Sequence, residues 1–337
     1  MSMKERARVV IIGGGIVGCG IAFHLAKMGW RDIVVVEQGR LFDTGGSTSH
    51  SPGLIFQSNS SKTMTELAKS SVDLYKDLEV DGRPGFSQVG SLEVAWTPER
   101  WEDLKRKAGL AMSWGLEPAL IGASEAREKV PILTDKLLGA VYLPTDGVAS
   151  AVPVTQAMGK IAQGLGATFY PRTTVTGIEV RDGRVQGVVT DRGRIQTEIV
   201  VSAAGIWGPL VGRMAGVSIP LVPMEHLYVE TGPLSELAGE TAEIRHPIMR
   251  HQDRALYFRQ WGERYAFGST DHEPMPIDPE DILSHEDSRE TPAISTFDPP
   301  YAPKAFASAV ELIPCLQNAE MVYSMGGLFS FTPDAMP

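Results

Sequence analysis

The first 37 residues combine a buried-strand pattern, a glycine-rich turn and a second strand pattern that ends in an acid. Residues 8–12 form a β-branched run, which is typical of a strand buried in a parallel sheet. The turn at residues 13–18 follows directly and has the spacing G-x-G-x-x-G. Apolar residues then recur at helical spacing up to Gly29, a usual helix stop. Residues 32–37 predict the next strand, and Glu37 lies 19 residues after Gly18, close to the separation of about 20 in dinucleotide-binding folds.

Each part of this unit has a mechanical task. Gly13 permits the sharp turn, Gly15 lets the backbone approach a pyrophosphate, and Gly18 lets the helix press on the strand. The helix N-terminus offers free N–H groups and a partial positive charge to that pyrophosphate. Glu37 is expected to accept hydrogen bonds from the adenosine ribose. The neighbouring residues that we expect to contact the same cofactor are Ile16, Val17 and Gln38. On its own, this unit does not distinguish FAD from NAD.

Composition excludes several other classes of protein. Residues 9–26 are apolar, but the glycines and His24 within them argue against a signal peptide or membrane anchor, and we expect no membrane span. The 31 basic and 41 acidic residues give a net charge of −10, which argues against nucleic acid as a partner. Two cysteines cannot form a disulfide framework, so a reducing compartment is expected. That compartment is the cytoplasm, or the mitochondrial matrix if the source is a eukaryote, although no transit peptide is evident. The remaining histidines show no metal-ligand spacing, and no metal is expected.

Later segments favour FAD. Residues 168–201 alternate in short strands, with turns at 181–184 and 191–194, and end in an apolar strand followed by Ala-Ala-Gly. Such a β-meander within a dinucleotide fold is typical of the two-dinucleotide-binding architecture of FAD enzymes. We therefore predict an α/β fold: a Rossmann-like FAD domain with an interleaved α+β substrate domain built on an antiparallel sheet. The predicted FAD-binding part comprises residues 1–83, 146–217 and 323–337, and the substrate-binding part residues 84–145 and 218–322. The proline-rich residues 273–304 predict a loop or lid.

A polar segment after the acid carries a family resemblance. Residues 45–54 read Gly-Gly-Ser-Thr-Ser-His-Ser-Pro-Gly-Leu. The chain resembles the FAD domain of the dimethylglycine oxidase, dimethylglycine dehydrogenase and sarcosine dehydrogenase family, within the glycine (D-amino-acid) oxidase fold, and is most similar to the oxidase. Supporting stretches lie at residues 90–95, 146–150, 173–178, 250–253 and 329–334. The resemblance extends from Val9 to Pro337.

The resemblance implies the site residues. It implies that His50 is bonded covalently to the 8α carbon of the flavin, with Ser47, Thr48 and Ser49 donating hydrogen bonds to the cofactor. Two further residues are implied to contact the cofactor, Leu54 and Val175. His226 and Tyr257 are implied to be catalytic and to lie at the flavin, Tyr257 also contacting it. Arg250, His251 and Arg259 are candidates for holding a substrate carboxylate, with surface pairing as the alternative.

The implied function is oxidation of a small N-methylated amino acid. N,N-dimethylglycine, oxidised to sarcosine, is the first expectation and sarcosine the second, with hydride passing from the N-methyl carbon to flavin N5. The resulting iminium is either hydrolysed to formaldehyde or captured by tetrahydrofolate in a separate C-terminal domain. Because family members continue beyond the matched region, we expect this chain to be part of a longer protein. The expected electron acceptor is O₂ or an electron-transfer flavoprotein. The alternatives are a glycerol-3-phosphate dehydrogenase-like enzyme of the same fold and a non-catalytic flavin-binding module.

Overall fold

A four-stranded parallel sheet organises the N-terminal part of the computed structural model, which describes residues 2–283, 291–296 and 302–334. Neighbouring strands lie in the order β11 (Thr168–Tyr170), β2 (Ile33–Val36), β1 (Val9–Ile12) and β15 (Val200–Ser202). All three pairings are parallel. The predicted strand–turn–helix–strand unit is confirmed, and the strand before Ala-Ala-Gly returns to the opposite side of β1.

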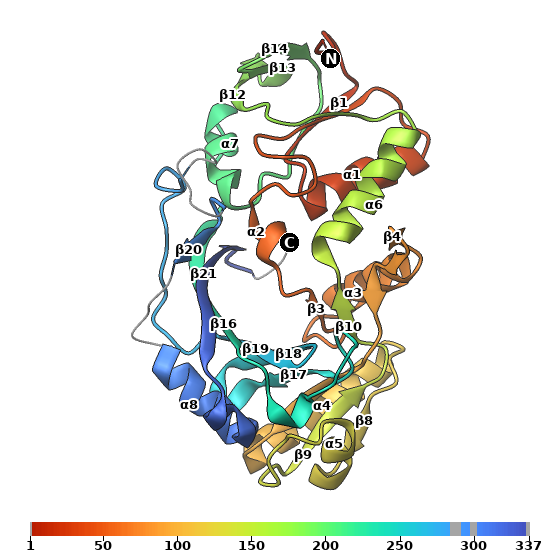
Figure 1. The fold of residues 1–337 in the computed structure, drawn as a ribbon. Coiled ribbons are helices and arrows are strands. Elements are labelled where there is room, and N and C mark those ends of the chain that lie inside the picture. Colours follow the sequence, from red (N-terminus) through yellow and green to blue (C-terminus); the bar gives the residue numbers. More distant parts are fainter. Residues whose placement is uncertain (1, 284–290, 297–301, 335–337) are drawn as a thin grey trace.

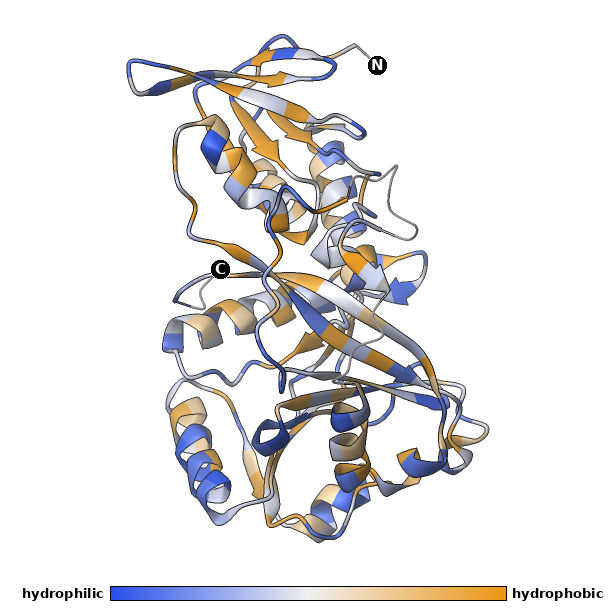
Figure 2. Cartoon of the chain, turned by 90° about the vertical axis from the view of Figure 1, so that its left-hand side faces the viewer, coloured by the Kyte–Doolittle hydropathy of each residue, from blue (hydrophilic) through white to orange (hydrophobic). Residues whose placement is uncertain are grey.

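The pleat of this sheet sends alternate side chains to two different layers. On one face, Val9 and Ile11 pack against helices α1 (Ile16–Lys27) and α6 (Ala151–Gly164), which lie side by side (Figure 1). On the other face, Val10 and Ile12 pack against the β-meander. The strands of this sheet are hydrophobic over most of their length (Figure 2), because both of their faces are buried.

The predicted β-meander is confirmed. Its antiparallel strands are β12 (Val175–Arg181), β13 (Arg184–Thr190) and β14 (Gly193–Gln196). Asp182 and Gly183 turn the chain with φ of 50° and 71°, and Gly193 has φ of 140°, the region that favours glycine and aspartate. Helix α7 (Gly208–Met214) packs beside it after the short 3₁₀ turn η1 (Gly205–Trp207).

The second large sheet has nine strands and is almost entirely antiparallel. Its strands, in order across the sheet, are β20 (Ile294–Thr296), β21 (Met321–Phe331), β16 (Val222–Thr231), β19 (Arg264–Ser269), β18 (Leu256–Trp261), β17 (Ile248–His251), β7 (Ser91–Ala95), β9 (Gly139–Leu143) and β8 (Ala119–Ile121). Only the β17–β7 pair is parallel. This sheet therefore joins the two segments that we assign to the substrate-binding part.

The two faces of the nine-stranded sheet differ in chemistry. One face carries residues such as Leu227, Val229 and Phe258, which form a core with helices α5 (Ala123–Lys129) and α8 (Ala302–Leu312). Residues one position away point to the opposite face, which we call the polar face; it carries His226, Tyr228, Tyr257, Arg250 and Glu93. Helix α4 (Pro98–Ser113) covers the far end of the polar face, over β7 and β9.

The remaining elements lie outside the two large sheets. They are the helices α2 (Ser47–His50) and α3 (Lys62–Lys76), the three-stranded sheet β3 (Leu54–Ile55), β10 (Gly147–Ala149) and β6 (Phe86–Ser87), the pair β4 (Glu79–Val80) and β5 (Arg83–Pro84), and the 3₁₀ turns η2 (Ser235–Leu237), η3 (Gln252–Arg254) and η4 (Pro314–Asn318). Helix α2 lies between the parallel sheet and the nine-stranded sheet (Figure 1), in contact with β21.

Two of the predicted ranges contain strands of the nine-stranded sheet. Residues 323–331, which we assign to the FAD-binding part, belong to β21 of the nine-stranded sheet, and residues 335–337 lie outside the described residues. The predicted loop at 273–304 contains the short strand β20 and a bridge from Pro276 to Met224, while residues 284–290 and 297–301 lie outside the described residues. The division into two domains stays a prediction.

Candidate active site

Two glycines of the N-terminal turn are required by close contacts. Gly13 has φ of 109°, and a Cβ on it would overlap the carbonyl oxygen of Ala203, just after β15. A Cβ on Gly18 would overlap the carbonyl oxygen of Gly13. Gly18 thus lets α1 press against the turn, as expected. Gly15 is less crowded, since a Cβ there would lie 3.1 Å from Thr48 Oγ1, and its approach to a pyrophosphate stays a prediction.

Glu37 holds the turn together. Its side chain is buried, and its two carboxylate oxygens accept the backbone N–H groups of Gly14 at 2.7 Å and Gly39 at 2.6 Å. Burial raises the pKa of Glu37, while these hydrogen bonds oppose the increase. Each oxygen retains a second lone pair, so the predicted contact with a ribose is compatible with this arrangement. Gln38 follows on the same segment and is half-buried.

The polar segment before His50 is fixed by hydrogen bonds to α1, to β21 and within the segment itself. Thr48 Oγ1 accepts the N–H of Ile16 at the start of α1, at 3.1 Å. Ser47 Oγ donates to the carbonyl of Leu328 at 2.7 Å, and Ser49 Oγ accepts the N–H of Gly45 at 2.9 Å. These three hydroxyls therefore position α2 between α1 and β21, and their predicted bonds to the cofactor stay predictions.

His50 is buried without a hydrogen-bond partner for either ring nitrogen among the described residues. Burial lowers its pKa to about 4, so the imidazole is neutral at pH 7. Its ring lies against Gly327, where a Cβ would be 2.9 Å from Nε2, and its centroid is 5.8 Å from that of Phe329. A buried polar group without a partner is costly, and a neutral imidazole nitrogen has the free lone pair that bonding to a flavin carbon requires. The residues present therefore fit the flavin.

His226 lies on β16, directly opposite Gly327 of β21. The ring of Phe329 contacts both His226, with centroids 5.5 Å apart, and His50. The structure thus brings together two histidines that are 176 positions apart in the sequence. Burial, and secondarily His272, lowers the pKa of His226 to about 4, which keeps this imidazole neutral as well.

His272 fixes the proton arrangement of His226, a contact that the sequence analysis missed. His272 Nδ1 lies 2.8 Å from the carbonyl oxygen of Glu273 and must carry a proton to donate there. In the neutral form of His272, Nε2 then has a lone pair, and at 3.1 Å from His226 Nδ1 it can accept a hydrogen bond from that nitrogen. His226 Nε2 is left as a proton acceptor.

The ring of Tyr257 lies over Gly268 of β19, where any Cβ would overlap it. On the other side of Gly268, Tyr228 stacks against Tyr257 with ring centroids 6.5 Å apart. Burial raises the pKa of Tyr228 to about 12 and raises that of Tyr257 further. Both phenols are therefore protonated at pH 7, so Tyr257 can donate a hydrogen bond but is a poor base.

The three carboxylate-binding candidates lie in different environments. His251 is fully buried on the apolar face, stacked on Trp96. The guanidinium of Arg259 donates to the Pro52 carbonyl at 2.7 Å and to Glu243 at 2.8 Å, so it joins the loop after α2 to the large sheet. Arg250 also lies on the polar face. Unlike the guanidinium of Arg259, that of Arg250 donates no hydrogen bond among the described residues.

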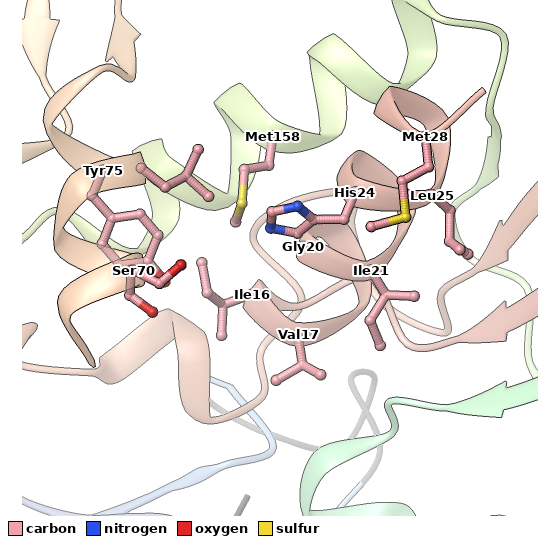
Figure 3. Close-up of a pocket in the computed structure, with 12 residues that line it drawn as sticks. Ile16, Val17, Gly20, Ile21, His24, Leu25, Met28, Ser70, Tyr75 and Met158 are labelled. Atoms are coloured by element: carbon pink, nitrogen blue, oxygen red, sulfur yellow. The ribbon is translucent and has the colours of Figure 1, made fainter. Parts of the chain in front are cut away.

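The remaining predicted cofactor residues lie along α1 and the nearby strands. Ile16 and Val17 line a mainly apolar hollow of about 460 Å³ between α1, α3 and α6, with Met28 and Tyr75 (Figure 3). Leu54 is in β3, and Val175 is buried at the start of β12. Their contacts with FAD stay predictions.

Two kinds of feature are absent from the part of the chain that the structure describes. None of the helices in the described ranges has the length and apolar character of a membrane span. In the same part of the chain, no three histidine, cysteine or acidic side chains are grouped to hold a metal ion.

The glycine turn on a parallel sheet, the inserted β-meander and the buried histidine facing a large antiparallel sheet define an FAD-dependent oxidoreductase. The chain belongs to the family described as DAO, FAD dependent oxidoreductase, which it matches over residues 8–337. It is 31% identical to human mitochondrial dimethylglycine dehydrogenase and 33% identical to mouse mitochondrial sarcosine dehydrogenase, over 99% of this chain. It is also 32% identical, over 99% of its length, to the mouse mitochondrial pyruvate dehydrogenase phosphatase regulatory subunit.

The chain spans only 39%, 36% and 37% of these three relatives, respectively. Among solved structures, L-proline dehydrogenase from P. horikoshii has a TM-score of 0.84 and 27% identity, with 99% of this chain and 84% of that chain covered. The predicted family and fold class are confirmed.

Proposed function

We propose that this chain is the FAD domain of an enzyme that oxidises the N-methyl group of a small amino acid, N,N-dimethylglycine first and sarcosine second. The observation that carries the proposal is His226, a neutral base with a fixed tautomer, held next to His50 by their shared contact with Phe329. The similarity to dimethylglycine and sarcosine dehydrogenases supports the choice of substrate.

FAD would be held by the glycine turn and the N-terminus of α1, by Glu37, and by a covalent bond to His50. The free lone pair of the neutral His50 imidazole supports this bond. The chemistry that bound FAD supplies is acceptance of a hydride from the carbon beside the amine nitrogen.

The residues of this chain prepare the amine for that step. An alkylammonium group with a pKa of about 10.4 is only about one part in 10³ neutral at pH 7, and the proton blocks the lone pair that hydride loss requires. His226 Nε2 accepts the ammonium proton, while His226 Nδ1 keeps its proton in the hydrogen bond to His272. Tyr257 donates a hydrogen bond that orients the substrate beside Gly268.

Two finer features belong to the same proposal. The electron acceptor is O₂ or an electron-transfer flavoprotein, and tetrahydrofolate enters only through a further domain of a longer protein. Cys19 and Cys315 are unpaired, which supports a reducing compartment, either the cytoplasm or the mitochondrial matrix.

The test is anaerobic mixing of the FAD-loaded protein with candidate substrates. Dimethylglycine should bleach the flavin absorbance and yield formaldehyde and sarcosine, because water hydrolyses the iminium that hydride loss leaves. Glycine, proline and glycerol 3-phosphate should bleach it far more slowly. Rapid bleaching by glycerol 3-phosphate alone would support the phosphate-ester alternative instead.

A second candidate is a non-catalytic flavin-binding module, favoured by the similarity to the phosphatase regulatory subunit. The same experiment tests it, because such a module predicts bound flavin that no amine bleaches. His226, Tyr257 and His50, all in place in this structure, support the enzyme.

A further inference from the structure

The two ring nitrogens of His226 have different surroundings. Nδ1 lies 3.1 Å from Nε2 of His272, and Nε2 is the atom that we assign to the substrate amine. Phe329 and Phe331 also pack against this ring, each at 80° to it, with centroids 5.5 and 6.0 Å away. A phenyl ring takes up no proton. Among the described residues, His272 is therefore the side chain to which the His226 imidazole can pass a proton.

His272 lies between His226 and the surface. It is half-buried, and its neighbours Asp271 and Glu273 are exposed. Its Nδ1 lies 2.8 Å from the carbonyl oxygen of Glu273, and the Asp271 carboxylate pairs with the exposed Lys304 at 2.9 Å. The ring thus has one nitrogen at the proposed base and the other at a segment that water reaches.

Backbone hydrogen bonds hold this second histidine next to β16. Before it, the N–H of Thr270 donates to the carbonyl of Ala255 at 2.9 Å, and after it, the N–H of Glu225 donates to the carbonyl of Met275 at 3.0 Å. Because Glu225 precedes His226 on β16, the second bond sets the distance between the two imidazoles. Their contact is therefore built into the fold on both sides.

We propose that His226 and His272 form a relay that carries the proton of the substrate ammonium from the site to the solvent. This inference rests on the proposed function. It adds a proton-transfer role to the positioning role of His272. An imidazole suits this task, because it can accept a proton at one nitrogen and release another proton from the other nitrogen.

The relay balances proton by proton. The ammonium proton bonds to Nε2 of His226, the proton on Nδ1 of His226 then passes to Nε2 of His272, and the proton on Nδ1 of His272 passes to water. The ammonium has lost one proton and the solvent has gained one. Both imidazoles end neutral, and the hydrogen bond between them runs in the opposite direction.

The relay resets when one proton returns along the same chain. With O₂ as the electron acceptor, formation of hydrogen peroxide takes up the hydrogen of the hydride and one further proton. If that further proton comes from water through His272 and His226, both rings regain their original tautomers. The relay is thus used once in each direction per turnover.

The test follows flavin bleaching and proton release together. The FAD-loaded protein is mixed anaerobically with dimethylglycine in weak buffer that contains a pH-indicator dye. One proton should appear for each flavin bleached, because hydrolysis of the iminium gives an ammonium product and releases no further proton. In the wild type the two signals should have the same rate.

His272→Gln separates the relay from positioning. Its amide oxygen can accept the hydrogen bond from His226 Nδ1, so bleaching should keep most of its rate, but an amide takes up no proton near neutral pH. Proton release should therefore lag behind bleaching by about 10²-fold, the lower end of the usual contribution of an acid–base side chain. Imidazole added to the buffer should remove the lag. His24→Gln, which removes an exposed imidazole on α1 (Figure 3), is the matched control and should show no lag.

The outcomes distinguish the relay from the reaction that it serves. Proton release in step with bleaching in His272→Gln would overturn the relay and leave the proposed function standing. If neither dimethylglycine nor sarcosine bleaches the flavin of the wild type, the proposed function fails and the relay fails with it. Should His272→Gln not retain FAD, His272→Ala decides. The relay then predicts a late proton that imidazole brings forward, and release in step with bleaching without imidazole would refute it.

Discussion

Three histidines, His50, His226 and His251, share a pKa lowered to about 4, and in each case burial is the main cause. Their surroundings separate their roles. His50 has two unpartnered nitrogens next to Gly327, and His226 has one nitrogen fixed by His272. His251 has no partner among the described residues either, but it lies on the apolar face against Trp96. A lowered pKa alone would not distinguish the proposed covalent anchor, the proposed base and a packed core residue, whereas their surroundings do.

His50→Ala tests the covalent anchor. A flavin held by packing and hydrogen bonds is released when the protein denatures, but a bond to an imidazole nitrogen does not depend on the fold. The wild type should keep its flavin through acid precipitation, and His50→Ala should release all of it. Mass spectrometry of the peptide containing His50 checks this result directly, because a peptide without an FAD adduct refutes the covalent bond.

Substitutions of His226 and His272 should slow flavin reduction to different extents. His226→Ala removes the base and should slow flavin reduction by about 10²- to 10⁴-fold. His272→Phe removes only the hydrogen bond that sets the tautomer, which is worth about 2- to 10-fold. Because His272 lowers the pKa of His226, its loss should also move the acidic limb of kcat/KM to higher pH.

Replacement by glutamine provides the control for this pair. The side-chain oxygen of His272→Gln can accept the same bond from His226 Nδ1 and should restore most of the rate. If His272→Phe has the rate and pH profile of the wild type, His272 does not position the base.

The elements differ in how far the sequence predicts them. Strands β1 and β2 and helix α1 follow each other directly, so spacing within 37 residues was enough to predict them. The order of the nine-stranded sheet is set by distant pairings, such as β7 with β17, and local patterns do not contain that information. The contact between His226 and His272 was missed for the same reason: it arises where the chain leaves β19 after Ser269 and pairs again with β16 at Met275.

Gly18→Ala tests the packing of α1 against the turn before it. The added Cβ would overlap the Gly13 carbonyl, and overpacking of this kind costs about 1–3 kcal/mol of unfolding free energy. Gly109→Ala is the matched control, because this position in α4 is exposed and a Cβ meets nothing within 4 Å. The control should gain about 0.5–1 kcal/mol. Urea unfolding measures both variants, and equal stabilities would contradict the close packing at Gly18.

The lowered pKa of His251 predicts how the stability of the folded protein changes with pH. Its pKa is lowered from 6.5 to about 4 in the folded protein, so the unfolded chain binds the proton more readily. The stabilisation from neutral His251 is complete above pH 6.5 and is lost as the pH falls towards 4, by about 3 kcal/mol in total. His251→Phe keeps a ring against Trp96 and should lose less stability between pH 7 and pH 5 than the wild type. Parallel stability curves for the two proteins in this range would refute the assignment.

In the whole molecule, the proposed site lies where the two sheets meet. The glycine turn and α2 come from the parallel-sheet side, while His226, Tyr257 and Arg250 come from the polar face of the nine-stranded sheet. Contacts that hold the two sides together include Ser47 with Leu328, His50 with Phe329, and Arg259 with Pro52. The family segments around His50, His226 and Tyr257 could be recognised in the sequence, but their convergence on one site required the fold.

The proposed reaction removes a hydride from an N-methyl carbon, and isotope substitution shows which carbon loses it. Anaerobic flavin bleaching is measured with dimethylglycine deuterated either in both N-methyl groups or in the glycine methylene. Loss of hydride from the methyl group predicts several-fold slower bleaching with the deuterated methyl groups and little change with the deuterated methylene. Slower bleaching with the deuterated methylene alone would mean that the α-carbon is oxidised, which would refute the proposed reaction.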